Sequence, residues 1–217
     1  MQNNNLKAGL IAGGVFVLLG SPAAGLFMLM RPGSTPIPAS FTAFSAPDGS
    51  FAGDGPTGWA TTSSSANAVA GGTAFQSGSA RISIVSDLAG SLVGDLSRSA
   101  DASLSSMSGM VPGLKLPQVL PVQKVHDMGK KSMEDLFKSY QEQPAQAFQA
   151  RFGDARISEF TADGGWMAGS LRGYRVTMLS NDRRVSIVCR CSAGDWNNLH
   201  PAFIHVINSI GPGKGGG

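Results

Sequence analysis

The clearest pattern in the last third of the chain is a two-residue alternation of apolar and polar positions. In the segment 185–191, every second position is taken by Val185, Ile187, Cys189 and Cys191. Side chains of a strand point alternately to its two faces, so these four side chains share one face. The strands predicted before it cover residues 155–162 and 171–179. We therefore expect three consecutive strands joined by short turns.

Two segments instead show the 3.6-residue period of an α-helix. The closing segment has large apolar side chains at spacings of 3, 4, 3 and 4 residues, namely Trp196, Leu199, Phe203, Val206 and Ile210. Residues 122–141 show a similar apolar stripe, with lysine and glutamate on the opposite side. Each pattern predicts a helix that buries one face and exposes the other. Because proline is tolerated in the first turn, Pro201 places the start of the closing helix near Asn197 or Asn198.

Shorter apolar runs separated by turn signals occupy the preceding part of the chain. Residues 41–45 predict a strand, and after a Pro-Asp-Gly turn a second strand includes Phe51. The Ser-rich run that follows Trp59 is predicted to be a loop. Residues 73–76 and 81–86 predict a hairpin around a Ser-Gly turn, because the second arm alternates isoleucine with polar side chains.

An uncharged apolar stretch from Ala8 to Met30 follows a short head of residues 1–7. As a helix it would reach roughly 34 Å, enough to cross the hydrocarbon core of a bilayer. We predict a single-pass membrane anchor over residues 8–30 that places the globular domain outside the cytoplasm. The alternative is a cleaved secretory signal, because Ser21-Pro22-Ala23 has the small-x-small form of a cleavage site. Small residues within the anchor would also allow weak self-association of such helices.

Segments rich in proline, glycine and serine divide the remainder of the chain. Residues 31–40 are predicted to be an extended Pro-rich spacer, and residues 41–210 one globular domain. Within that domain, Asp87 is a favourable N-cap for a short helix, and residues 101–121 form a flexible linker that contains methionine and leucine. Residues 211–217 are predicted to be a Gly-rich tail.

The distribution of charge argues against nucleic acid as a partner. Charged residues make up 14% of the chain, and the net charge is +3. The tightest basic groups are Lys130-Lys131 and Arg183-Arg184. Binding to a phosphate backbone needs several cations on one face, so we expect no nucleic-acid binding.

The cysteines and the last two histidines are predicted to be structural. Cys189 and Cys191 would lie about 6.6 Å apart on one strand with parallel side chains, which is near the limit for an unstrained disulfide. Buried cysteine behaves as a small hydrophobic residue, so the pair extends an apolar row. His200 and His205 are about 140° apart around a helix and cannot face one metal ion.

No sequence motif for catalysis or cofactor binding is found. The chain has no G-x-S-x-G, H-E-x-x-H, C-x-x-C or Walker pattern. Asp48 and Asp54 frame a Gly-rich turn but lack the alternating ligands of a calcium loop. We therefore expect a protein that is not an enzyme, with no catalytic, cofactor-binding or metal-binding residues. A hydrolase would need a cleft that joins His126 or His200 to an acid and a nucleophile.

Two stretches carry a resemblance to a known family: "DGSFAGDGPTGW" early in the domain, and "GYRVTML…RRVSIVCRC…DWNNLHPAFIHVINSI" at its end. Together they resemble the PsbP-like α/β sandwich family, which includes the lumenal photosystem II extrinsic subunit and a Ran-binding nuclear import factor. The comparable positions are Phe51, Trp59, Gly173, Tyr174, Trp196, Phe203 and Ser209. Asp54-Gly55 replaces the usual extended residue before the early proline, so that strand is expected to be short.

The resemblance covers about residues 41–210 and implies an α+β fold, in which helices cover both faces of an antiparallel sheet. Members of the family generally act by binding other proteins. We therefore expect a membrane-tethered, non-catalytic binding or scaffold domain, which meets a protein partner through an exposed sheet edge or the Met-rich linker. The alternative is a carrier of a small ligand or lipid, with a pocket between sheet and helices lined by Tyr174, Met178 and Trp196.

Overall fold

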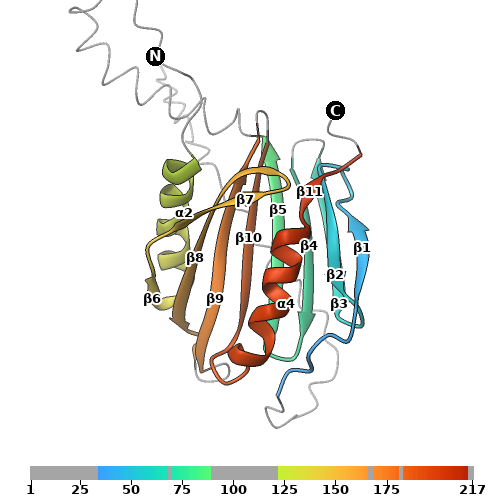
Figure 1. Ribbon diagram of the computed structural model, residues 1–217. Coiled ribbons are helices and arrows are strands. Elements are labelled where there is room, and N and C mark those ends of the chain that lie inside the picture. The colour runs from blue at the N-terminus through green and yellow to red at the C-terminus, as the bar shows by residue number, and fades with distance from the viewer. Residues whose placement is uncertain (1–33, 68–69, 89–121, 166–168, 181–182, 215–217) are drawn as a thin grey trace, which may run out of the picture.

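A computed structural model describes residues 34–67, 70–88, 122–165, 169–180 and 183–214, and shows two antiparallel sheets and two helices (Figure 1). The large sheet contains β3 (Ala60–Asn67), β4 (Ala70–Ser77), β5 (Ala80–Leu88), β6 (Lys138–Glu142), β7 (Gln146–Ala150), β8 (Gly153–Asp163), β9 (Ser170–Leu179) and β10 (Arg183–Ser192). The small sheet contains β1 (Phe41–Ser45), β2 (Phe51–Pro56) and β11 (Gly211–Pro212). The helices are α2 (Val122–Leu136) and α4 (Trp196–Ser209).

The large sheet runs in the order β3-β4-β5-β10-β9-β8-β6, and β7 also pairs with β8. In its centre, Ile187 of β10 lies opposite Val176 of β9 and Ile84 of β5. Side chains at these positions are fully buried and form the main core with the apolar stripe of α4. The alternation in the sequence therefore selects the face on which α4 packs.

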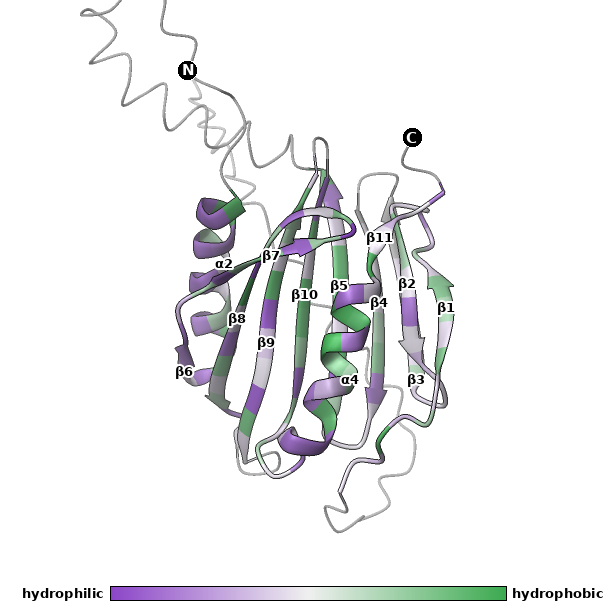
Figure 2. Ribbon diagram, in the orientation of Figure 1, coloured by the Kyte–Doolittle hydropathy of each residue, from purple (hydrophilic) through white to green (hydrophobic). Residues whose placement is uncertain are grey.

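The opposite face of the same sheet is covered in part by α2, which contacts β6, β8 and β9. A smaller apolar cluster joins Met133 of α2 to Phe160, Ala162 and Leu171 of the sheet. Figure 2 shows that α2 is mostly hydrophilic in colour, whereas α4 carries more hydrophobic residues. The prediction of one helix on each face of an antiparallel sheet is confirmed.

The small sheet lies beside α4 (Figure 1). Together with α4 it covers the main core, and its side chains reach β4. The ring of Phe44 in β1 packs edge-to-face against the rings of Phe51 and Phe75, at centroid distances of 6.1 and 5.0 Å. Gly55 leaves room for the Phe75 ring, because a Cβ atom there would lie 2.5 Å from it. The chain continues past Ile210 into β11, so the first two residues of the predicted tail pair with β2.

Most predicted elements are found, with three differences. The Ser-rich run after Trp59, predicted to be a loop, is strand β3. The helix predicted over residues 122–141 ends at Leu136, and the residues after it form β6. Asp87, predicted to be an N-cap, lies in β5, where its carboxylate pairs with Arg184 of β10. β3 pairs with the next strand along the chain, whereas β6 and the end of β5 pair with the more distant strands β8 and β10. In each case strand pairing overrides the local pattern of the sequence.

Ser34 is the first described residue, and the next residue, Thr35, is hydrogen-bonded to Asp195 of the domain. Asp195 Oδ2 accepts hydrogen bonds from Thr35 N at 3.1 Å, Thr35 Oγ1 at 2.8 Å and Ser79 Oγ at 2.8 Å. Thr35 is 4% exposed, so this part of the predicted spacer lies against the domain.

The predicted head, anchor and linker, residues 1–7, 8–30 and 101–121, lie outside the described residues. Among the described helices, none is long and apolar enough to cross a bilayer.

Candidate functional site

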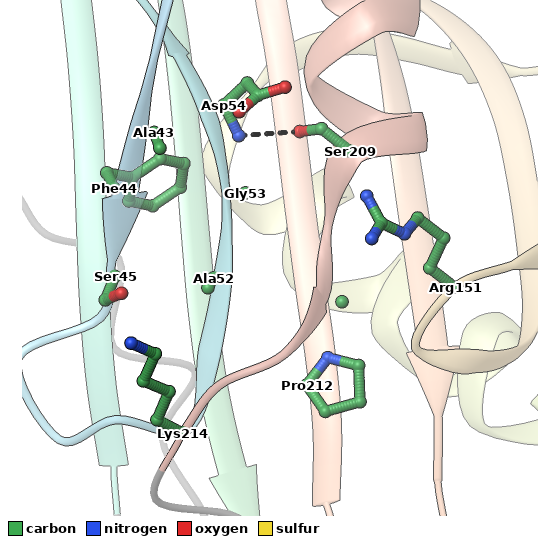
Figure 3. A pocket seen from close by; sticks show the side chains of 11 residues that line it. Ala43, Phe44, Ser45, Ala52, Gly53, Asp54, Arg151, Ser209, Pro212 and Lys214 are labelled. Carbon is green, nitrogen blue, oxygen red and sulfur yellow. Dashed lines mark hydrogen bonds between the residues drawn. The ribbon is translucent and has the colours of Figure 1, made fainter.

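An open groove of about 600 Å³ lies where the small sheet meets the end of α4 (Figure 3). Small side chains of β1 and β2 form its floor, and the chain from Ser209 to Lys214 forms one wall. Arg151, in the turn between β7 and β8, lines the groove from the far side of this segment, next to Gly211 (Figure 3). The groove therefore joins three segments that are far apart in the sequence.

Two hydrogen bonds of Ser209 fix the wall against the floor. Its hydroxyl accepts from the backbone N of Asp54 at 2.8 Å and donates to the carbonyl O of Val206 at 2.7 Å. Gly53 allows this close approach, because a Cβ atom there would lie 2.6 Å from Cδ1 of Ile210. The end of α4 and strand β2 are thus held together.

A tight turn brings Arg151 to the groove. Gly153 follows it with φ +145°, a conformation that favours glycine, and a Cβ atom there would lie 2.5 Å from the carbonyl O of Leu179. Arg151 and Lys214 are both exposed at the groove, and within the described part of the chain no carboxylate pairs with either. The acidic residue of the groove, Asp54, lies 3.5 Å from His205 Nε2. Arg151 and Lys214 therefore line the groove without a described carboxylate partner, whereas Asp54 lies next to His205.

Both cysteines lie in the main core, as predicted. Cys189 and Cys191 are fully buried free thiols on the α4 face of β10. Burial raises the pKa of Cys189, and burial together with the nearby Asp195 carboxylate raises that of Cys191 to about 12. Thiols in this state are poor nucleophiles and poor metal ligands at neutral pH.

The two histidines of α4 lie apart, as predicted from their spacing. The His200 ring stacks on Trp196 at 5.7 Å, and the His205 ring stacks on Phe41 at 3.9 Å. The two aspartates weighed as calcium ligands also have other partners. Asp48 Oδ1 accepts hydrogen bonds from Ser50. Among the described residues, no group of three or more His, Cys, Asp or Glu side chains could hold a metal ion.

The structure does bring His126 together with an acid and hydroxyl groups, inside the domain rather than in a cleft. His126 Nδ1 lies 3.0 Å from Thr177 Oγ1, and its Nε2 lies 2.9 Å from Ser158 Oγ. Glu142 Oε1 accepts from the Ser158 hydroxyl and lies 2.7 Å from Arg175 Nη2. Arg175 Nη1 donates to the carbonyl O of His126 at 2.6 Å. These five side chains, here called the polar cluster, join α2 to β6, β8 and β9.

The polar cluster does not have the arrangement of a hydrolytic triad. In a triad, the acid holds the imidazole nitrogen that faces away from the nucleophile. Here Ser158 Oγ and Glu142 Oε1 lie on the same imidazole nitrogen, Nε2, at 2.9 and 3.4 Å, and Nδ1 faces the hydroxyl of Thr177. His126 and Ser158 are 1% and 2% exposed, so no substrate reaches them in this conformation. The geometry instead docks α2 through buried polar groups that bond to one another, although Glu142 Oε2 has no hydrogen-bond partner among the described residues.

The polar cluster makes stability sensitive to acid. Burial alone would raise the pKa of Glu142, but hydrogen bonds from His126 and Ser158 and the charge of Arg175 lower it from 4.5 to about 2. A carboxyl whose pKa is lower in the folded state stabilises the protein above its unfolded pKa. That contribution is lost as the pH falls from 4.5 to about 2.

We therefore expect the free energy of unfolding to fall steeply below pH 4.5. Urea titrations at a series of pH values should show a smaller fall in Glu142→Gln, although this variant is less stable at neutral pH. The exposed carboxylate Asp135, which pairs with Lys131, provides the control Asp135→Asn, which removes a carboxyl outside the polar cluster. Equal slopes for Glu142→Gln and the unchanged chain would contradict the assignment.

The three residues expected to line a carrier pocket pack in the core. Met178 is fully buried, Trp196 is 4% exposed, and the rings of Tyr174 and Trp196 lie 4.9 Å apart. The groove is elsewhere, and none of its lining residues was predicted to be functional. Arg151 and Lys214 are single cations in their local sequence, so no periodicity or motif marks them. Only the folded chain brings them together.

Neither a protein-family model nor a curated protein sequence matches this chain. Solved structures do. Cyanobacterial PsbP (CyanoP) from Synechocystis matches with a TM-score of 0.53 and 12% identity, over 85% of this chain and 98% of that one. The Ran-binding protein Mog1p from Saccharomyces cerevisiae has a TM-score of 0.44 and 8% identity, over 79% and 94% of the two chains. LpqN from Mycobacterium tuberculosis, described as involved in cell envelope biogenesis, has a TM-score of 0.39 and 10% identity, over 84% and 86%.

At such low identity a similarity of structure concerns the fold alone, and the function has to be argued from the site. The match to CyanoP spans almost the whole of that protein. This chain therefore has a PsbP-like α+β fold.

Proposed function

We propose that this protein is a non-catalytic binding domain, tethered to a membrane by residues 8–30, whose groove holds an acidic segment of a protein partner. The observation that carries the proposal is the pair of exposed cations, Arg151 and Lys214, that line the groove together with small residues. Carboxylates of a partner would pair with Arg151 and Lys214, which have no carboxylate partner among the described residues.

The shape of the groove favours an extended peptide segment over a compact small molecule. Small-molecule sites are concave and bury most of the ligand surface. This groove is open, and its lining includes Ala43, Ser45, Ala52 and Gly53, which allow a backbone to approach closely. Arginine and lysine at the rim add charge complementarity, which steers association and selects acidic partners.

The position of the groove suits a tethered domain. Thr35 is fixed to Asp195, directly before the first turn of α4, whereas the groove lies at the last turn of the same helix. A helix of 14 residues is about 20 Å long. The tether would therefore join the domain near the start of α4, whereas the groove lies at the end of the same helix.

Charge reversal at the groove tests the proposal with a defined probe. We expect the full chain in detergent to bind a fluorescein-labelled poly-glutamate peptide, and Arg151→Glu/Lys214→Glu to weaken binding about tenfold at low salt. Fluorescence anisotropy over a salt series measures this effect. The control Lys130→Glu/Lys131→Glu makes the same change of net charge on α2. Equal weakening in both variants would show a response to net charge alone and would contradict the groove assignment.

A second experiment tests the groove and the tether in the native membrane. A biotin ligase fused after Gly217 would lie a few residues beyond Lys214, beside the groove. A protein partner whose labelling is lost in Arg151→Glu/Lys214→Glu, and kept in the α2 control, supports the groove. If alkaline carbonate releases the full chain from vesicles, the tether is wrong, whereas the groove remains open to the peptide test.

A further inference from the structure

Strand β3 forms one edge of the large sheet, and no described strand pairs with its outer side. Among the described strands, β3 pairs with β4 alone. In an antiparallel pair, every second residue directs its backbone N–H and C=O away from the partner strand. The side chains of residues 60–63 are exposed on both faces of the sheet. No other described element therefore covers these side chains at the edge.

The edge at β3 lacks the features that protect sheet edges from pairing. Natural edges are protected by charged side chains, proline, bulges or short length. β3 has eight residues with the sequence ATTSSSAN, without a charge or a proline. Its register with β4 is regular from Ala60 to Ser65, and the irregularity lies beyond that point.

The opposite edge of the same sheet has this protection. β6 has five residues, begins at Lys138, and shifts its register on β8 between Lys138 and Gln141. Ser139 within it has φ +51°, which interrupts regular pairing. β1 of the small sheet is uncharged as well, but it has five residues against eight in β3. The contrast between the two ends of the large sheet singles out β3 as an edge that can accept a strand.

We propose that β3 pairs antiparallel with β3 of a second copy of this chain, around a two-fold axis, and joins two large sheets into one. Recognition of a foreign strand takes its selectivity from pockets or charges for alternate side chains, and residues 60–64 offer neither. Self-pairing needs no such pockets or charges, because the two-fold axis places the same strand of both copies at the interface and each contact occurs twice. Serine and threonine can hydrogen-bond to one another across the seam, and no like charges meet there. No residue of β3 lines the groove, so this inference does not depend on the proposed function.

Cysteine scanning of the full chain tests the seam. Thr61→Cys, Thr62→Cys, Ser63→Cys and Ser64→Cys are made singly and oxidised with copper phenanthroline in membrane vesicles. The native cysteines can stay, because both are fully buried. Opposed residues of antiparallel strands lie within disulfide range, so we expect a covalent dimer at one or two adjacent positions and a decline on either side. Gln141→Cys on β6 is the matched control for random collision.

The possible outcomes separate self-pairing from other events. A maximum in β3 with little crosslinking at Gln141→Cys supports the proposal. Equal crosslinking at all positions indicates collision or pairing through another segment and overturns it, as does a covalent product with a different protein.

A charge introduced at the seam gives an independent readout. In the best cysteine variant, adding Thr62→Lys, or Thr61→Lys if that variant is Thr62→Cys, should lower dimer yield about fivefold or more, because like charges then oppose each other. Gln141→Lys should leave the yield unchanged, and equal yields in the two lysine variants would overturn the proposal.

Discussion

Replacement of Arg175 by methionine is expected to lower the free energy of unfolding by about 3–5 kcal/mol, because it leaves a buried carboxylate without its cation. Glu142 and Arg175 are 4% and 7% exposed, and Arg175 also donates to the carbonyl O of His126. The substitution removes three roles at once: the charge partner of Glu142, a hydrogen bond to α2, and a side chain that spans the cluster. Urea denaturation followed by circular dichroism at neutral pH measures the loss.

A surface pair provides the matched control for this prediction. Arg172 and Glu159 lie 2.6 Å apart but are 40% and 30% exposed, so Arg172→Met should cost less than about 1 kcal/mol. The double variant Arg175→Met/Glu142→Leu removes both buried charges and should recover part of the stability lost in Arg175→Met. Similar losses for Arg172→Met and Arg175→Met, or no recovery in the double variant, would show that the buried pair does not stabilise α2 as argued.

The main core could be predicted from the sequence because each of its elements carries a complete local pattern. In α4 the apolar spacing alone identifies the buried side, and Leu199, Phe203 and Val206 are fully buried. In β10 the alternation alone places Cys189 and Cys191 in the core. Burial of one face causes such a pattern, so the buried side of the helix or strand can be predicted without knowing which element packs on it.

The polar cluster could not be predicted, because its contacts join residues far apart in the sequence and leave no local pattern. His126 lies in α2, and its hydroxyl partners Ser158 and Thr177 are separated from it by 32 and 51 residues. No local spacing links a histidine to partners at such distances, and Ser158 and Thr177 occupy the polar positions of alternating strands. A hydrolase would need His126 in a cleft, whereas the partners of this histidine bury it. The groove cations Arg151 and Lys214 escaped prediction likewise, because their neighbours in space are remote in sequence.

β3 was missed because strand propensity depends strongly on context. A run of small polar side chains is typical of loops, and nothing within residues 60–67 alternates in hydropathy. The strand exists because β4 offers a ladder of backbone partners from Gln76 to Ala70. Edge strands with both faces exposed need no apolar positions, so hydropathy carries no signal for them. The proposed self-pairing therefore depends on a strand that has no hydropathy pattern of its own.

Replacement of Gly173 by alanine is expected to cost about 3 kcal/mol of unfolding free energy, because the added methyl group has no space on β9. A Cβ atom there would lie 2.2 Å from the carbonyl O of Cys189 and 2.6 Å from Cζ of Phe160. The first contact is with backbone, so β9 and β10 would have to separate and weaken the ladder at the centre of the large sheet. Gly194, where a Cβ atom would meet nothing within 4 Å, provides the control Gly194→Ala, which should change the free energy of unfolding by less than about 0.5 kcal/mol. Thermal denaturation of both variants measures the difference, and a Gly173→Ala chain as stable as Gly194→Ala would mean that the strands do not approach each other this closely.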